Sequence, residues 1–130
     1  MQSFSFLRSA LLLAFFLAFT IPLAHSQEPP SEAPPANVEG KWTIYAKAGN
    51  GETSTKYIEL KQNGNTLSGH FKGPNQSGGL EGTVNGQTIM FRTKTKWVFT
   101  FRGRVEGDKI QGTFHDRRGQ GEWQAVRSQQ

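Results

Sequence analysis

The segment LEGTVNGQTI, residues 80–89, has the same pattern of apolar, glycine and polar residues as FRGRVEGDKI at residues 101–110. In both segments an apolar residue, a glycine and a second apolar residue alternate with polar residues, and a tight turn and a second alternating stretch follow. Apolar residues at every second position indicate a β-strand with one buried face. Asn85-Gly86 lies between two such strands and predicts a type I′ hairpin turn, in which both central residues have positive φ. The repeat therefore predicts consecutive antiparallel hairpins.

The same period of two runs through residues 38–127 and predicts one all-β domain of about eight strands. Apolar or glycine residues at alternating positions occur at Trp42 and Ile44, Ile58 and Leu60, Leu67 to Phe71, Leu80 to Val84, Ile89 and Phe91, Trp97 to Val105, Ile110 to Phe114, and Trp123 and Ala125. Glycine and asparagine between these stretches are typical of short turns. We expect the strands to pair in chain order as an antiparallel meander.

Four glycines fall on the inward-facing positions of the predicted strands, where the other residues are apolar: Gly69, Gly82, Gly103 and Gly112. A missing side chain on the inner face allows a strand to bend sharply. A flat sheet needs no such bends, so the glycines favour a closed or nearly closed barrel, in which they have a structural role.

Residues 1–26 have the pattern of a secretory signal peptide. Arg8 precedes an apolar run at residues 10–21, Pro22 interrupts it, and Ala24-His25-Ser26 places small residues at a cleavage site before Gln27. The apolar run is shorter than the roughly 20 residues that a spanning helix needs. We therefore predict a periplasmic or extracellular protein with no membrane anchor after cleavage. An uncleaved N-terminal anchor is the alternative.

Residues 27–37 contain four prolines and no large apolar side chain, which predicts a disordered, semi-extended linker before a barrel at 38–127. The whole chain has a formal charge of +5, and removal of residues 1–26 leaves fourteen basic and ten acidic side chains, a charge of +4. The chain has no cysteine, which excludes disulfides and a lipid-modified cysteine. A domain this small must then depend on a dense core.

Nothing in the spacing of the polar residues predicts catalysis, so we expect a protein that is not an enzyme and has no cofactor. His70 and His115 both fall on outward positions, and neighbouring residues of a strand point to opposite faces. Two histidines without cysteine are too few for a tetrahedral zinc site, so no metal site is expected. An enzyme that uses carboxylates brought together by folding is the least favoured alternative.

The aromatic residues suggest either a filled core or a shallow pocket. The inward positions carry Trp42, Phe71, Phe91, Trp97, Phe99, Phe101, Phe114 and Trp123. An eight-stranded barrel is just wide enough for such side chains to fill, or for one small ligand. A ligand pocket, if present, is predicted at one mouth of the barrel beside Phe91, Trp97 and Trp123.

Five cations lie on or between two successive predicted strands: Arg92, Lys94, Lys96, Arg102 and Arg104. Hairpin pairing would place them on one outer face, which could bind an anionic component of the cell envelope. Nucleic acid is not an expected partner of an exported protein. A solvated face that prevents edge pairing of strands is the alternative.

The two ends of the predicted barrel resemble the calycin group, the lipocalin- and avidin-type barrels. Gly40-Lys41-Trp42 opens the first strand, and Trp123-Gln-Ala-Val-Arg127 closes the last. The resemblance implies that Trp42 and Arg127 are structural partners at a closed end. No Thr-Asp-Tyr motif follows a central strand, which departs from lipocalins and puts an open ligand cup in doubt. The chain also resembles exported bacterial domains of the same pattern, a likeness that implies a fold and a location but no activity.

These observations predict a non-enzymatic exported module that binds a small apolar or amphipathic ligand or an anionic envelope component. The alternative is a barrel that docks onto or inhibits another exported protein.

Overall fold

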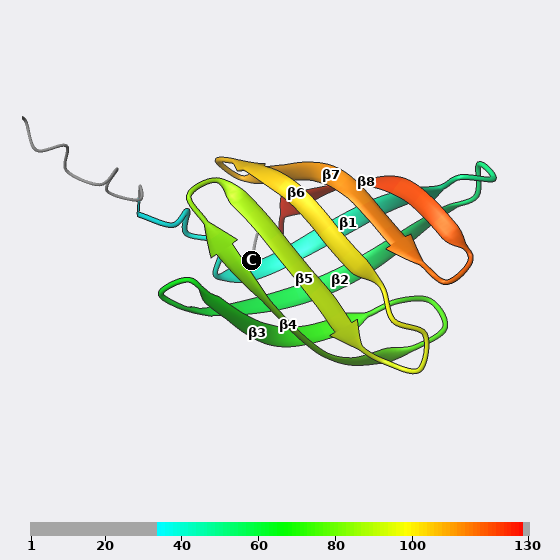
Figure 1. Cartoon of the computed structure of the whole chain (residues 1–130), viewed down its shortest axis with the longest axis horizontal. Coiled ribbons are helices and arrows are strands. Elements are labelled where there is room, and N and C mark those ends of the chain that lie inside the picture. The colour runs from blue at the N-terminus through cyan, green and yellow to red at the C-terminus, as the bar shows by residue number, and fades with distance from the viewer. Residues whose placement is uncertain (1–33, 129–130) are drawn as a thin grey trace, which may run out of the picture. The chain divides into compact units, whose positions relative to one another are not determined.

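Eight strands follow one another in the computed structural model, which describes residues 34–128. They are β1 (Gly40–Ala48), β2 (Thr53–Asn63), β3 (Thr66–Lys72), β4 (Ser77–Asn85), β5 (Thr88–Lys94), β6 (Thr100–Glu106), β7 (Lys109–Asp116) and β8 (Gly119–Arg127). Each strand pairs antiparallel with the next, and β1 pairs with β8, so the sheet closes into a barrel (Figure 1). The predicted all-β meander and its closure are confirmed.

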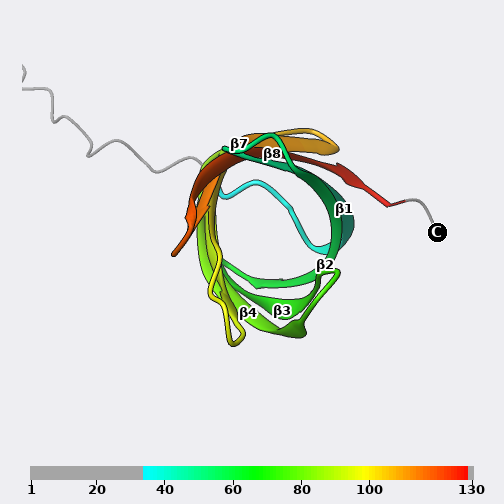
Figure 2. The ribbon, with the colours of Figure 1, turned by 90° about the vertical axis from the view of Figure 1, so that its right-hand side faces the viewer.

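The barrel has two different ends. At one, which we call the closed end, β1 begins, β8 finishes, and two-residue turns join β2 to β3, β4 to β5 and β6 to β7. The other, which we call the mouth, carries the β1–β2, β3–β4, β5–β6 and β7–β8 connections and faces the viewer in Figure 2. No helix long and apolar enough to cross a membrane occurs in residues 34–128.

The β4–β5 hairpin is where the sequence predicts it, but its turn type differs. The central residues are Gly86 and Gln87, with Asn85 opposite Thr88 at the strand ends. Gly86 has a φ of 57°, and no residue other than glycine has positive φ in the described part of the chain. This matches a type II′ turn, in which glycine takes the first central position. Asn85 therefore belongs to the strand.

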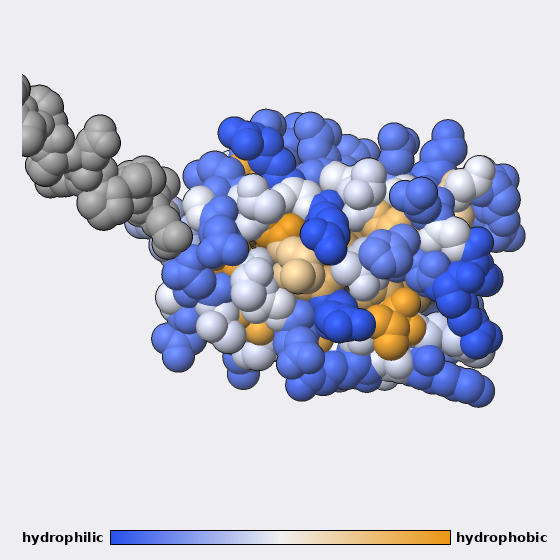
Figure 3. Space-filling model, in the orientation of Figure 1, coloured by the Kyte–Doolittle hydropathy of each residue, from blue (hydrophilic) through white to orange (hydrophobic). Residues whose placement is uncertain are grey.

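Inward side chains from all eight strands fill the middle of the barrel. The rings of Phe91 and Phe101 are stacked with centroids 4.8 Å apart, and the Trp123 ring meets both edge-on. The indole N–H of Trp123 donates to the Arg102 carbonyl at 3.0 Å, so burial leaves this polar group satisfied. The barrel centre is a packed aromatic core, and most residues on the outer face drawn in Figure 3 are hydrophilic.

The inward glycines allow neighbouring strands to approach closely. Gly103 of β6 lies directly opposite Gly112 of β7, and a Cβ atom on Gly103 would be 2.9 Å from the Trp123 ring. The Trp123 ring therefore occupies space that a side chain at position 103 would need, whereas a side chain at position 112 would meet the backbone of β6. Gly69 and Gly82 approach their neighbours more closely still, because a Cβ atom on either would overlap backbone atoms of β2 or β5, respectively.

Residues 34–39 run across the closed end (Figure 2). Val38 is fully buried there, and its carbonyl accepts the indole N–H of Trp42 at 2.9 Å. The guanidinium of Arg127 lies 4.4 Å from the Trp42 ring centroid and donates to the carbonyls of Glu39 and Asn37. This segment includes the last residues of the predicted linker. The rest of the linker, and the predicted signal peptide at 1–26, lie outside the described residues.

One predicted strand is shorter than its sequence pattern. The alternation begins at Trp97, yet β6 begins at Thr100, and residues 95–99 form a loop. The amide of Phe99 donates to Thr93 Oγ1 at 3.0 Å, and the amide of Trp97 donates to Gln76 Oε1 at 3.1 Å. Because polar side chains accept these two backbone donors, the amides of Trp97 and Phe99 stay paired where the chain leaves the strand ladder.

Candidate binding site in the barrel mouth

The mouth of the barrel contains an open cavity of about 1060 Å³. Its walls come from all four mouth connections and the adjoining strand ends, and its apolar lining includes Phe71, Phe99 and Phe114. Phe71 is itself fully buried at the base of the cavity, and Phe91 and Phe101 do not line it. The cavity is therefore a cup with an aromatic floor above a packed core, a form that small-ligand sites commonly take.

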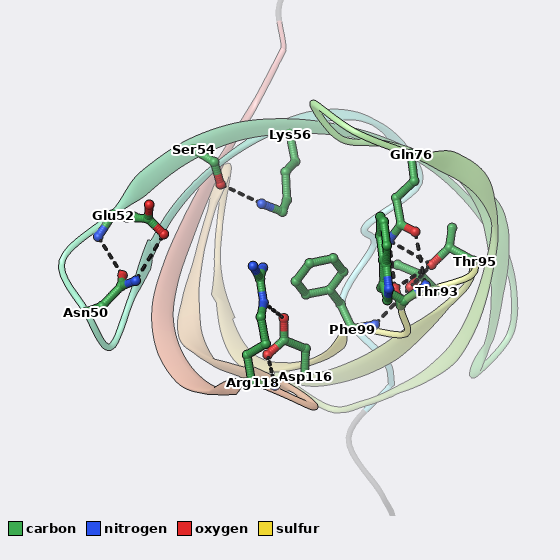
Figure 4. Close-up of polar contacts among 11 residues, drawn as sticks. Asn50, Glu52, Ser54, Lys56, Gln76, Thr93, Thr95, Phe99, Asp116 and Arg118 are labelled. Carbon is green, nitrogen blue, oxygen red and sulfur yellow. Dashed lines mark hydrogen bonds and ion pairs between the residues drawn. The ribbon is translucent and has the colours of Figure 1, made fainter.

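Lys56 of β2 projects into this cup from one wall (Figure 4). The residue is only 5% exposed, and its ammonium donates to Ser54 Oγ at 2.5 Å. The Nζ atom also lies 5.2 Å from the centroid of the Phe99 ring. No carboxylate is paired with Lys56 within residues 34–128. A buried cation ordinarily has such a partner, so this site is unusual.

The surroundings of Lys56 disfavour its charge. Burial lowers the pKa of its ammonium below the ordinary value, because the charged form loses hydration. The positive charge of Arg118 lowers this pKa further, whereas the carboxylate of Asp116 raises it. The two lowering effects outweigh the attraction of the single carboxylate.

Arg118 reaches into the cup from the opposite wall. It lies in the β7–β8 turn, where its amide donates to Asp116 Oδ1 at 2.9 Å and its Nε donates to Oδ2 at 3.4 Å. The side chain of Arg118 is 78% exposed and that of Asp116 only 8%. Figure 4 shows Lys56 and Arg118 pointing toward each other across the mouth. Two cations thus converge on one space, and the Asp116 carboxylate beside them is already bound to Arg118.

A polar network holds the loop that carries Trp97. The side-chain amide of Gln76 donates to the Trp97 carbonyl at 2.6 Å, and Thr95 Oγ1 donates to the same carbonyl at 2.8 Å. These bonds join the β3–β4 and β5–β6 connections (Figure 4). They fix Trp97 at the rim of the cup, where Lys96 Nζ lies 5.2 Å from its ring.

The structure separates the three aromatic residues that the sequence placed at a ligand mouth. Trp97 lines the cup, whereas Phe91 and Trp123 are buried in the core below it. Period-two parity puts all three on the inside but carries no information about depth along the barrel axis. Depth depends on the register between strands.

The five cations on and beside the β5–β6 hairpin divide into two groups. Arg92, Lys94, Arg102 and Arg104 lie exposed on its outer face, and Lys96 does not. Lys94 is 3.4 Å from the Glu81 carboxylate on β4, and Arg104 is 3.8 Å from Glu106. Lys96 lies in the loop above Trp97, away from the strands. The outer face is therefore a mixed-charge surface in which two of the five cations have carboxylate neighbours.

The sequence reasoning did not identify Lys56, Ser54 or Arg118. Lys56 and Ser54 share the inward parity of Ile58 and Leu60, which is a usable signal, because a lysine on an apolar face needs an explanation. Arg118 gives no such signal, since it lies in a turn.

The two histidines of residues 34–128 lie apart from the cup. His70 and His115 are exposed on the outside of the barrel. Across residues 34–128, no three histidine or carboxylate side chains are grouped so that they could hold a metal ion.

Neither a protein-family model nor a curated protein sequence matches this chain. A similar solved structure is that of a redesigned β-barrel, with 11% sequence identity and a TM-score of 0.60, over 72% of this chain and 92% of that one. At this identity the likeness shows a shared fold and nothing about the site.

Proposed function

We propose that this chain is a non-enzymatic exported module that binds a small amphipathic molecule with an anionic group in its barrel mouth. The convergence of Lys56 and Arg118 above an aromatic floor carries the proposal. An anionic group between them would reduce the repulsion of the two cations and accept hydrogen bonds from both. The apolar part of the ligand would pack on Phe71, Phe99 and Phe114.

The mouth is a better anion site than the outer β5–β6 face. Lys94 and Arg104 on that face have neighbouring carboxylates, and its cations are surrounded by water, where charge interactions are weak. Lys56 is buried, and charged hydrogen bonds contribute more when solvent is excluded.

The proposal predicts that an aromatic anion binds in the mouth and depends on Lys56. A suitable probe is 8-anilinonaphthalene-1-sulfonate, with uncharged N-phenyl-1-naphthylamine as its counterpart. Lys56→Met should lower the affinity for the anion by about tenfold or more, because a charged hydrogen bond contributes about 1.5–3 kcal/mol. The same substitution should change binding of the neutral probe much less. Fluorescence titration measures both affinities.

Two further variants test the alternative sites. Lys47→Met removes an exposed lysine of β1 and should leave both affinities unchanged. If Arg102→Glu with Arg104→Glu reduces anion binding while Lys56→Met does not, the outer face is the site. If none of the substitutions changes the affinity for the anion, or if neither probe binds, the mouth proposal fails. Docking onto another exported protein then becomes the better hypothesis. Circular dichroism checks that each variant is folded.

We also propose export and a kinship with calycin-type barrels. The arginine stacked over the first-strand tryptophan supports the kinship, and the pattern of residues 1–26 supports export to the periplasm or beyond. Intact-mass analysis of the protein expressed with residues 1–26 in a bacterial host should find a mature chain that begins at Gln27. A membrane-bound product with the mass of the full chain would contradict this prediction.

A further inference from the structure

The amine of Lys56 has the surroundings of a nucleophile as well as those of an anion-binding cation. It is buried, faces an aromatic ring, and is hydrogen-bonded to a neutral hydroxyl and not to a carboxylate. Lysine amines become nucleophilic when they are desolvated in an apolar pocket or lie near another cation, because both favour the neutral amine. Lys56 meets both conditions, and it lines an open cup that a small molecule can enter.

The charged groups around Lys56 decide how much neutral amine is present. Arg118 and Arg117 come from the β7–β8 turn, Glu52 from the β1–β2 rim, and Asp116 from the end of β7. Burial and Arg118 lower the pKa of Lys56, and Asp116, which is bound to Arg118, raises it. With a lowered pKa, a larger fraction of this amine is neutral at pH 7 than of an exposed lysine, whose ordinary pKa is about 10.4.

We infer that Lys56 captures small apolar aldehydes in the barrel mouth as a reversible imine, a reaction that rests on the ligand cup of the proposed function. The lone pair of Nζ forms a bond to the carbonyl carbon, and the C=O π electrons move to oxygen. The nitrogen loses its proton and the oxygen gains it, which gives a carbinolamine. Loss of this oxygen and the second amine hydrogen as water then forms the C=N bond. The products are one imine and one water, and no oxidant or reductant takes part.

The cup determines which aldehydes fit. The apolar part of the molecule would lie on Phe99, Phe71 and Phe114, with the carbonyl carbon toward Lys56. The Ser54 hydroxyl, in hydrogen-bond contact with Nζ, is placed to relay the proton that the nitrogen gives up. Aromatic or medium-chain aldehydes therefore match the site better than formaldehyde, which gains nothing from the aromatic floor.

The test is reductive trapping with 2-naphthaldehyde. The protein is incubated with this aldehyde and cyanoborohydride at pH 7, and peptide mapping by mass spectrometry gives the labelling rate of each lysine. Lys56 should be labelled at least about tenfold faster than Lys47, because burial favours the neutral amine of Lys56 and the cup holds the aldehyde beside it. The preference should shrink at pH 9.5, where exposed lysines become partly neutral. Equal rates for the two lysines at pH 7 would overturn the inference.

Two measurements on the unaltered protein separate this inference from the proposed function, namely the labelling rate of Lys56 and the affinity for the aromatic anion. Lys56→Arg cannot form an imine, so rapid labelling at this position should disappear. Lys47→Arg is the matched control and should change neither result. Selective labelling without anion binding would contradict the proposed function alone, and anion binding without selective labelling would contradict this inference alone. If Lys56→Arg does not fold, the labelling rates of Lys56 and Lys47 in the unaltered protein still test the inference.

Discussion

Phe101→Ala is expected to lower the free energy of unfolding by about 3–5 kcal/mol, the usual cost of truncating a buried phenylalanine. Phe101 is fully buried, and its ring centroid lies 4.8 Å from that of Phe91, 5.2 Å from Trp123 and 5.6 Å from Phe114. Removing the ring leaves a cavity among rings that strand pairing holds apart. Since small domains are stable by about 5–15 kcal/mol, the loss is a large fraction of the total. Urea unfolding measures it.

The matched control is Tyr57→Ala, because Tyr57 is an aromatic residue of β2 that is 52% exposed. Tyr57→Ala should lower the free energy of unfolding by less than about 1 kcal/mol, which is within the range of strand propensity. Similar losses for the two variants would mean that the core does not depend on the aromatic packing described above.

Gly112→Ala is expected to destabilise the barrel by about 1–3 kcal/mol or more, as overpacking of a core typically does. A Cβ atom at Gly112 would overlap the Arg102 carbonyl and lie 2.5 Å from the Gly103 Cα. These are backbone atoms of the neighbouring strand, so a rotamer change cannot relieve the overlap, and β6 and β7 must move apart. The midpoint of urea unfolding reports the effect.

Gly79→Ala provides the control within the same sheet. Its Cβ atom would be 3.7 Å from the Gly69 carbonyl and from the Lys94 side chain, which is ordinary contact distance. Alanine also restricts the unfolded chain, so this substitution should be neutral or slightly stabilising. If both variants unfold at the same midpoint, close strand approach at Gly112 is not what the glycine provides.

The fold could be predicted largely from local patterns because a small antiparallel barrel repeats one rule. Every second residue faces a common interior, so alternation alone places Trp42, Phe71 and Phe101 inside. The inward glycines indicate bending, and bending of consecutive hairpins leads to closure. Local pattern fails at Trp97, which continues the alternation but leaves the strand because Gln76, from a different connection, accepts its amide.

The candidate site could not be predicted in the same way because closure of the barrel creates it. Lys56 on β2 and Arg118 after β7 are distant in the chain, and neither is unusual until the two walls of the mouth face each other. The electrostatic conflict between them depends on burial and on where Asp116 lies. Parity indicates that Lys56 points inward but does not reveal what it meets there.

The segment of residues 34–39, which crosses the closed end, also determines where this barrel can be attached to a surface or to another molecule. Residues 34–39 enter there, and Ser128, which donates its amide to the Lys41 carbonyl at 2.8 Å, ends the described chain at the same place. A sensor surface, a dye or a fusion partner joined directly at residue 34 or residue 128 would thus be attached opposite the mouth. The four mouth loops carry no such attachment. They could therefore be lengthened or varied to change the opening of the cup while the point of attachment at the closed end stays the same.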